Sequence, residues 1–425
     1  MTPALSTLPM KDSGMEWVGT IPLHWDVRPF YSFAAEVVSP NTGLKERNLL
    51  SLSYGQLVRK DMDRLGGLTP ASFEGYNIIE ANDIVFRLTD LQNDQRSLRS
   101  ARALERGIIT SAYVTVRPQT CPRFFEYLMR SYDTSKVFYG IGGGIRQSMK
   151  FADLKRLPVV VPPISEMEEI ASYLDRATSR IDTLVAKKTR FIELLREKRQ
   201  ALITHAVTKG LDPGAPMKDS GVEWLGKVPE TWDTAPLKSF LQLRRDIVGS
   251  ESSNTKLLSL TLQGVIERDL ENPTGKMPTS FDGYQRISAG EMVFCLFDMD
   301  ETPRTVGVAP QDGMLTGAYT VFRPQSELWA RYLYYFFLHV DEYKRLRPFY
   351  KGLRKTIRPG PFLSIQVPRP TEREAKAIVA HLDSATSRID TLIAKTERSI
   401  ELLREHRTAL ITAAVTGKLD LRPAA

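Results

Sequence analysis

Apolar residues recur at alternating steps of four and three in two long stretches of the chain, which predicts two helices, each with a coiled-coil seam. The predicted seam positions are Ile170, Leu174, Ala177, Ile181, Leu184, Ile192, Leu195 and Leu202 in the first stretch, and Ile378, Leu382, Ala385, Ile389, Leu392, Ile400, Leu403 and Leu410 in the second. Lys188, Lys198, Thr396 and His406 interrupt the inner positions. Because an isolated helix would expose such a stripe to water, we expect the two stripes to bury each other.

Both helices carry start and stop patterns. A capping box predicts each start and a glycine predicts each end; these residues are Ser165 with Glu168, Thr371 with Glu374, Gly210 and Gly417.

The helices belong to a repeat with a period of about 208 residues. Residues 10–17 (MKDSGMEW) match 217–224 (MKDSGVEW), and 177–184 are identical to 385–392 (ATSRIDTL). Two copies are too few for a solenoid, whose units are also shorter. We therefore predict a tandem duplication of a domain plus an appended helix, which would give a two-fold pseudosymmetric molecule.

The part of each copy before the helix mixes short alternating runs, such as 113–116 (YVTV) and 319–322 (YTVF), with turn patterns, and this predicts an irregular α+β domain. The predicted segments are domain 1 at 1–163, helix 1 at 164–212, domain 2 at 213–370 and helix 2 at 371–420. Helix 1 must deliver the chain to domain 2 and helix 2 must run back. We therefore expect an antiparallel pair about 60 Å long, with the two chain ends close together.

The composition of the chain also indicates the cellular compartment. The chain has 425 residues, 42% hydrophobic and 25% charged, with two cysteines and five histidines. Too few cysteines are present for a disulfide framework or a cysteine-ligated zinc site, no HExxH pair occurs, and no apolar stretch reaches membrane-spanning length. We expect a cytoplasmic protein without a metal or cofactor.

The formal charge is +8, and the cations are concentrated in one place. Residues 343–358 contain seven cations and no acidic residue; the cations are Lys344, Arg345, Arg347, Lys351, Arg354, Lys355 and Arg358. A phosphate-facing surface explains this density, because like charges repel unless a polyanion or solvent screens them. A solvated loop is the alternative.

Two similar but non-identical domains held apart by a spacer suit DNA with a bipartite, asymmetric target. The opening MKDSG-x-EW-x-G-x-x-P-x-x-W of each half, the LPVVVPP run at 157–163 and the Leu-Asp pairs at 174–175 and 382–383 resemble the specificity subunits of type I restriction-modification systems. The resemblance spans essentially the whole chain. It implies two target-recognition domains, two spacer helices and no catalytic centre. It also implies two partner modification subunits that methylate adenine, and restriction subunits for ATP-dependent cleavage.

One junction departs from the family pattern. The family often has Glu-Gln after the prolines that precede each helix, whereas Met167 follows Glu166 and Ala375 follows Glu374 here, and Arg369 separates the prolines of copy two.

Comparison of the two copies separates residues that would maintain the fold from residues that would confer specificity. If the halves recognise different sequences, identical residues cannot supply the difference, so the base-contacting residues are expected where the copies diverge. The first candidate segments are 93–106 in copy one against 298–312 in copy two, and the second are 54–64 and 262–276. The candidate DNA-binding residues outside the run at 343–358 are Arg96, Arg99, Arg102, Arg106, Gly144, Arg146, Lys150 and Arg304, and Gly352 joins the run itself. For the shared tryptophans Trp17, Trp25, Trp224 and Trp232, a place in the core or a partner surface is favoured over base stacking.

The sequence contains only weak matches to the motifs of catalytic sites. The segment 138–143 fits the F-x-G-x-G pattern of methyltransferase cofactor loops, but copy two does not repeat it and no [DN]PP[FY] motif occurs. No Walker A sequence is present either. The alternative to a DNA-recognition subunit is a coiled-coil scaffold whose basic domains bind protein or RNA.

Overall fold

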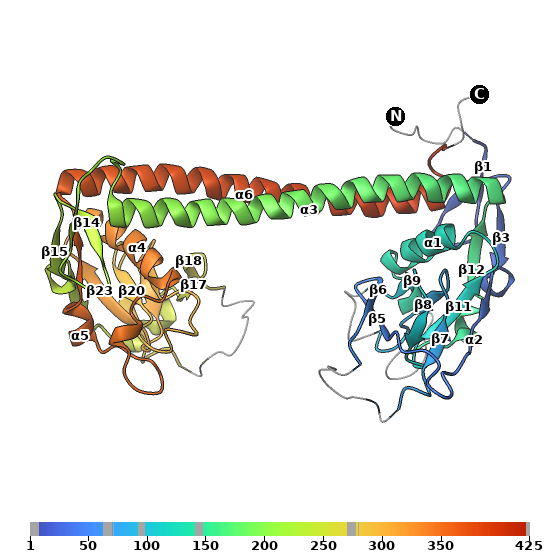
Figure 1. Cartoon of the computed structure of the whole chain (residues 1–425), viewed down its shortest axis with the longest axis horizontal. Coiled ribbons are helices and arrows are strands. Elements are labelled where there is room, and N and C mark those ends of the chain that lie inside the picture. Colours follow the sequence, from blue (N-terminus) through green and yellow to red (C-terminus); the bar gives the residue numbers. More distant parts are fainter. Residues whose placement is uncertain are drawn as a thin grey trace. The chain divides into compact units, whose positions relative to one another are not determined.

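The computed structural model describes residues 8–62, 70, 72–91, 98–140, 148–269, 278 and 280–421. The chain divides into two units: unit 1 comprises Met1–Thr189 with Arg398–Ala425, and unit 2 comprises Arg190–Glu397. Each unit holds one compact part of the repeat and a section of both long helices, α3 (Ile164–Lys209) and α6 (Glu372–Val415) (Figure 1). This division differs from the four predicted segments because packing joins part of each long helix to each compact part.

The compact part of unit 1 is built from short elements. These are β1 (Met10–Asp12), β2 (Thr20–Pro22), β3 (Asp26–Pro29), η1 (Phe30–Ser32), β4 (Ala34–Glu36), β5 (Leu50–Ser53), β6 (Gln56–Arg59), β7 (Asn77–Ile79), β8 (Ile84–Phe86), β9 (Ser100–Arg102), β10 (Gly107–Ile109), β11 (Val114–Pro118), α1 (Pro122–Thr134), η2 (Val137–Tyr139), α2 (Phe151–Leu154) and β12 (Pro158–Val161).

Unit 2 repeats these elements in the same order. They are β13 (Met217–Asp219), β14 (Lys227–Pro229), β15 (Asp233–Pro236), η3 (Leu237–Ser239), β16 (Leu241–Arg244), η4 (Gly249–Asn254), β17 (Leu258–Thr261), β18 (Gly264–Glu267), β19 (Gln285–Ile287), β20 (Met292–Phe294), β21 (Val306–Val308), β22 (Gly313–Leu315), β23 (Thr320–Pro324), α4 (Glu327–Glu342), η5 (Arg347–Phe349), α5 (Pro359–Leu363) and β24 (Gln366–Arg369). Among the described residues, only η4 lacks a counterpart in unit 1.

A four-stranded antiparallel sheet lies at the centre of each unit, in the order β4-β11-β8-β9 in unit 1 and β16-β23-β20-β21 in unit 2. The predicted strands at 113–116 and 319–322 fall in β11 and β23. Two-stranded pairs surround each sheet, among them β3 with β12 and β15 with β24. The mixture of helices and strands confirms the α+β composition.

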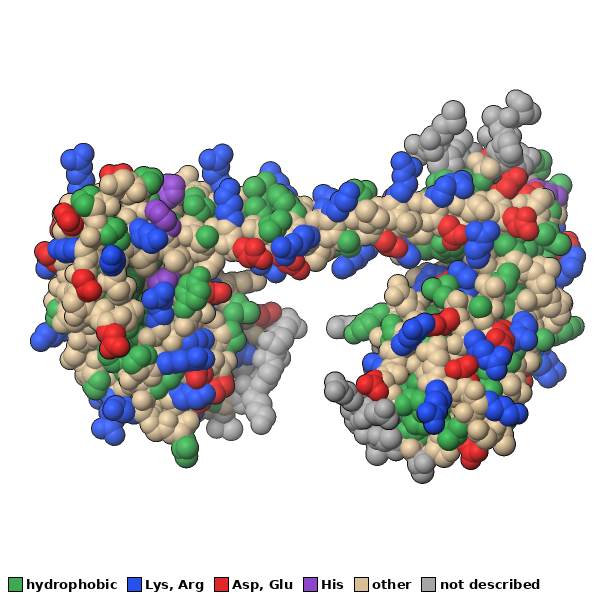
Figure 2. Space-filling view, viewed as in Figure 1, with side chains coloured by type: hydrophobic (Ala, Val, Ile, Leu, Met, Phe, Trp, Pro, Cys, Tyr) green, Lys and Arg blue, Asp and Glu red, His purple; other side chains and the backbone are tan. Residues whose placement is uncertain are grey.

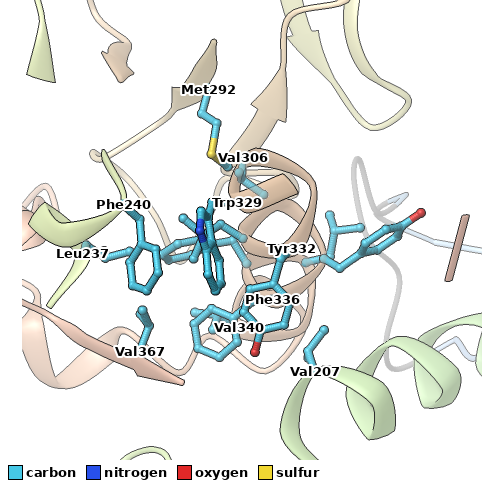
Figure 3. Close-up of a cluster of buried hydrophobic side chains, with 14 of the residues drawn as sticks. Val207, Leu237, Phe240, Met292, Val306, Trp329, Tyr332, Phe336, Val340 and Val367 are labelled. Carbon is cyan, nitrogen blue, oxygen red and sulfur yellow. The ribbon is translucent and has the colours of Figure 1, made fainter. Parts of the chain in front are cut away.

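One amphipathic helix covers each central sheet, α1 in unit 1 and α4 in unit 2 (Figure 1). In Figure 3, Trp329, Tyr332 and Phe336 project from α4 into a cluster with Phe240 and with Val207 of α3. Tyr332 is completely buried. Both long helices thus complete the core of unit 2, and the same holds in unit 1, where Leu174 and Ile411 join the core cluster.

A polar contact fixes α4 to the long helix beside it. Tyr335 donates to the Asp383 carboxylate over 2.7 Å, and its hydroxyl lies 3.3 Å from that of Thr386. Burial raises the pKa of Tyr335 to about 12. Unit 1 repeats the contact with Tyr127, Asp175 and Thr178.

The long helices pair antiparallel within each unit. In unit 2, Arg196 bonds Glu397 at 3.1 Å and Arg199 bonds Asp390 at 3.0 Å, so numbers rise along α3 as they fall along α6. In unit 1 the start of α3 and the end of α6 share one core cluster, and Arg407 lies 3.0 Å from Asp182.

The predicted seams lie on the correct helices, but part of their register is wrong. Ile170, Leu174, Ile181, Leu195, Ile378, Leu382 and Ile389 are buried, and Leu202, Leu403 and Leu410 are half-buried. Leu184 and Leu392 are each 46% exposed, and their neighbours Val185 and Ile393 face inward instead.

The cause of the shift is a buried threonine in each helix. Thr178 takes the inner position that the apolar pattern gave to Ala177, because its hydroxyl bonds the Leu174 carbonyl oxygen at 2.7 Å. From there the steps of four and three reach Val185 rather than Leu184. The same shift places Arg199 and Arg407 half-buried in the seam, whereas Lys198 and His406 are exposed. Lys188 is half-buried and Thr396 is buried, as predicted.

The helix ends agree with three of the four predicted patterns. Thr371 and Glu374 form the predicted capping box, and Gly210 and Gly417 adopt φ values of 76° and 72° directly after the helices. No Ser165 to Glu168 box occurs among the described hydrogen bonds, because α3 already begins at Ile164.

The neighbouring Glu166 has another role at the start of α3. Its carboxylate accepts from the indole N–H of Trp25 over 2.8 Å. Trp25 and Trp232 are buried, which confirms their predicted place in the core. Trp17 and Trp224 are half-buried and pack edge-on or tilted against the buried rings of Tyr132 and Phe336.

Candidate nucleic-acid interface

An acidic loop from elsewhere in unit 2 lies against the basic run 343–358. The loop between β20 and β21 runs alongside the run, with the Asp298 N–H donating to the Arg354 carbonyl oxygen at 2.8 Å and the Ile357 N–H donating to the Leu296 carbonyl oxygen at 2.9 Å. Carboxylates of the same unit therefore supply part of the screening that the sequence analysis assigned to a polyanion or to solvent. Sequence distance hides the pairing, because the two segments are about 50 residues apart.

Four carboxylates pair with the cations of the run. The ion pairs are Arg347–Asp300 at 3.0 Å, Arg354–Asp298 at 2.8 Å, Lys355–Asp300 at 3.0 Å, Lys355–Glu301 at 2.7 Å and Lys344–Asp341 at 2.6 Å. The Arg354 guanidinium holds the pKa of Asp298 below its usual value, and Arg347 with Lys355 does the same for Asp300. Figure 2 shows the resulting mixture, with acidic side chains among the basic ones on the visible face of unit 2.

Residues 351–356 of the basic run form a short hairpin. The backbones of Lys351 and Thr356 exchange hydrogen bonds of 2.9 and 3.0 Å, and between them Gly352 and Lys355 have φ values of 68° and 44°. Glycine suits the left-handed position because it has no Cβ to clash. At the turn, the Leu353 side chain is fully exposed, with a relative accessibility of 102%.

The other predicted cations of unit 2 divide by exposure. Lys344 donates to the Thr302 carbonyl oxygen at 2.7 Å and the half-buried Arg304 to the Tyr334 hydroxyl at 3.4 Å, so both have internal roles. Exposed cations without a carboxylate partner among the described residues are Arg345, Lys351 and Arg358. Arg345 also donates to the Trp224 carbonyl oxygen at 3.3 Å.

In unit 1, Arg99 does not reach the surface. It is completely buried, with its guanidinium bonding the Tyr139 hydroxyl at 3.2 Å and the Thr89 and Asp90 carbonyl oxygens at 3.2 and 3.4 Å. The prediction that it contacts DNA is therefore wrong in this structure, because a spacing argument cannot distinguish an exposed arginine from one that fills a polar core site.

The next two arginines are held by acidic residues. Arg102 donates to Glu126 at 2.8 Å and to Asn82 at 3.0 Å. Arg106 is half exposed and donates to Glu46 at 3.1 Å and Glu80 at 2.7 Å. The Asn48 N–H and the Arg106 guanidinium lower the pKa of Glu46.

Of the remaining candidates of copy one, one is a surface residue and three lie outside the described residues. Lys150 is exposed before α2, where its backbone N–H donates to Asp153 at 2.8 Å. Arg96, Gly144 and Arg146 lie outside the described residues.

The structure also shows what identical residues do. Arg117 and Arg323, from the Arg-Pro-Gln sequence of each copy, donate to the buried carboxylates of Asp83 at 2.7 Å and Glu291 at 3.2 Å. They tie each sheet together and do not distinguish the units. The exposed Tyr54, at the β5–β6 turn, begins the segment 54–64 that was predicted as a candidate for base contact. The exposed Leu353 was not predicted as a contact residue; an apolar residue beside a glycine in a turn was the available pattern.

No group of three or more His, Cys, Asp or Glu side chains in the described ranges could hold a metal ion. Nor does any helix found there have the length and apolar character needed to cross a membrane.

Comparisons with known proteins agree on one family. A type I restriction enzyme specificity subunit assigned as MjaX, from Methanocaldococcus jannaschii, is 23% identical over 71% of this chain and 69% of its own length. The StySPI specificity subunit of Salmonella potsdam is 24% identical over 46% of this chain and 44% of its own length. No family model matches.

Solved structures with the same fold include two type I proteins. A chain from a structure on complex assembly and conformational transition of the type I R-M system aligns with a TM-score of 0.66 at 14% identity, over 94% of this chain and 99% of that one. The HsdS subunit of Thermoanaerobacter tengcongensis aligns with a TM-score of 0.54 at 15% identity, over 94% of this chain and 98% of that one. This chain is thus similar to type I specificity subunits in sequence and shares the HsdS fold.

Proposed function

We propose that this relative of the type I restriction enzyme specificity subunits is a non-catalytic DNA-recognition subunit, in which each unit recognises one half of a bipartite, asymmetric target. The observation that carries the proposal is the duplicated fold with dissimilar surfaces, combined with the similarity to known specificity subunits. Residues 1–163 and 213–370 would be the target-recognition domains, and 164–212 and 371–420 the spacer helices.

Partner subunits would supply the chemistry. The proposed partners are two modification subunits, which would methylate adenine in both half-sites, and restriction subunits, which would cleave with ATP. The duplicated fold supports two equivalent docking sites, because residues shared by the copies can present the same surface twice.

DNA contact in unit 2 would start from Arg345, Lys351 and Arg358, which carry charge without a carboxylate partner among the described residues. Phosphate contacts fix position, and base contacts from the divergent loops would add specificity. Arg102, Arg106 and the ion-paired cations would contact DNA only by exchanging a carboxylate for a phosphate.

The test is purification of the chain with its modification subunits, followed by methylome sequencing of a host that carries them and by footprinting on the motif found. A bipartite methylated motif, protected in the footprint with two half-sites, is expected. Equal protection of unrelated duplexes would refute the proposal and favour a scaffold whose basic domains bind other ligands.

A further inference from the structure

The hairpin at 351–356 carries a fully exposed leucine among cations, and its geometry is fixed by contacts on both sides. An exposed leucine alone is ordinary on protein surfaces. Leu353, however, is the most exposed of the large apolar side chains in the described ranges, at 102%, and it projects from a tight turn instead of lying on a flat surface.

Several interactions hold the turn in place. Arg354 reaches Asp298 at 2.8 Å, and its guanidinium lies over the Phe297 ring at 5.2 Å from the ring centre. Lys355 reaches Glu301 at 2.7 Å. A side chain presented on a fixed turn loses little conformational freedom when it binds, so such a turn suits insertion into a partner.

The surrounding charge indicates which partner. Lys351, two residues before the leucine, is exposed and has no carboxylate partner among the described residues, and Arg358 is the N-cap residue of α5, five residues after the leucine. Cations beside one apolar tip suit a polyanion with an apolar interior, and a DNA duplex has both phosphates and stacked bases. Leucine is among the side chains that proteins insert between base steps.

We propose that Leu353 is a wedge that enters the base stack of the half-site bound by unit 2, while Lys351 contacts the flanking phosphate. This inference rests on the proposed function and adds a deformation of the DNA to it. The energetic cost of opening a base step depends on its sequence, so the wedge would add specificity at a position where no hydrogen bond to a base is made.

The experiment uses the complex of the full chain with its modification subunits. Duplexes that contain the methylated motif carry 2-aminopurine at successive positions of each half-site, because this base fluoresces when it is unstacked. The adenine that becomes methylated is excluded from the scan, since enzymes that modify a base take it out of the stack.

We expect one further position to become unstacked with the wild-type chain. Leu353→Ala should abolish that fluorescence and weaken binding by about tenfold or more, the effect of losing a buried leucine side chain. Leu353→Met, which keeps the apolar volume, should retain both. Leu392→Ala removes the same atoms from an exposed site on α6 and should leave both unchanged.

The outcomes separate the two proposals. If the wild-type complex protects the bipartite motif but no extra position is unstacked, or if the fluorescence persists in Leu353→Ala, only the wedge is refuted. Loss of assembly with the modification subunits in Leu353→Ala would refute the wedge as well, by identifying Leu353 as a protein contact. If the wild-type complex protects no bipartite motif, the DNA-recognition function and the wedge both fail.

Discussion

The carboxylate of Asp300 holds two cations of the basic run. Arg347 and Lys355 each lie 3.0 Å from it, and Lys355 also lies 2.7 Å from Glu301. Asp300→Asn removes the charge and keeps the volume. We expect the variant to bind DNA more tightly at low salt and to lose affinity more steeply as salt increases, because Arg347 can then turn to a phosphate while Lys355 keeps its ion pair with Glu301.

The magnitude follows from the number of freed cations. Each phosphate contact contributes about 0.9 to the slope of log affinity against log salt, so the one contact that Arg347 can add changes the slope by about 0.9. Between roughly 50 and 200 mM salt, the variant would lose about three- to fourfold more affinity than the wild type. The fold should tolerate the change, because ion pairs at the protein surface contribute little to stability.

The assay is fluorescence anisotropy of the complex on a duplex without the target motif, over a salt series. Asp233→Asn is the matched control, since it makes the same charge change at an exposed carboxylate of unit 2 whose nearest cation is 4.0 Å away. The reasoning would be refuted by a slope that is unchanged in Asp300→Asn, or by an equal increase in the control.

Three further predictions concern stability and spacing. Burial lowers the pKa of His339 to about 4, so below about pH 6.5 the unfolded chain binds more protons than the folded one. The melting temperature should therefore fall between pH 6.5 and pH 4, and it should fall less in His339→Asn than in the wild type. An equal reduction of the fall in the exposed His406→Asn would contradict this. Insertion of four residues near Lys188 and four near Thr396 should widen the gap between methylated half-sites by about two base pairs, at 1.5 Å per residue and about 3.4 Å per base pair; an unchanged motif gap would show that the helices do not set the spacing. A circular permutant with new ends within 213–216 should melt as one cooperative protein near the wild-type temperature, because Leu8 and Leu421 line one pocket of unit 1; separate melting or insolubility would contradict it.

Periodicity was enough to locate the helices but not to fix the seam. The capping pair Thr371 and Glu374 and the glycine at 210 marked ends that the structure has. The register of the seam could not be predicted, because a hydrophobicity pattern assigns Thr178 to the polar face of the helix. In the structure Thr178 is buried, and its hydroxyl bonds the Leu174 carbonyl oxygen. A buried threonine that bonds its own helix can therefore shift a predicted seam by one residue.

Surface charge was less predictable than secondary structure. The run at 343–358 was correctly identified as basic, but its neutralisation by Asp298 and Asp300 depends on a loop pairing that only the fold creates. Arg99 presents the opposite case, because an arginine in a polar segment became a core residue. In both cases the deciding contact joins residues far apart in sequence, and pattern analysis of a single segment cannot detect it.

The acidic loop itself is a difference between the copies. Phe86 of β8 corresponds to Phe294 of β20, and counting onward from these phenylalanines places Gln92 opposite Asp300 and Asn93 opposite Glu301 in the sequence. Copy one therefore lacks two of the carboxylates that hold the basic turn of copy two. If each unit recognises its own half-site, substitutions in the first half-site and the second should change binding with different salt dependence. The identical arginines at the sheets and the buried tryptophans cannot produce that difference, so it must arise in the loops where the copies diverge.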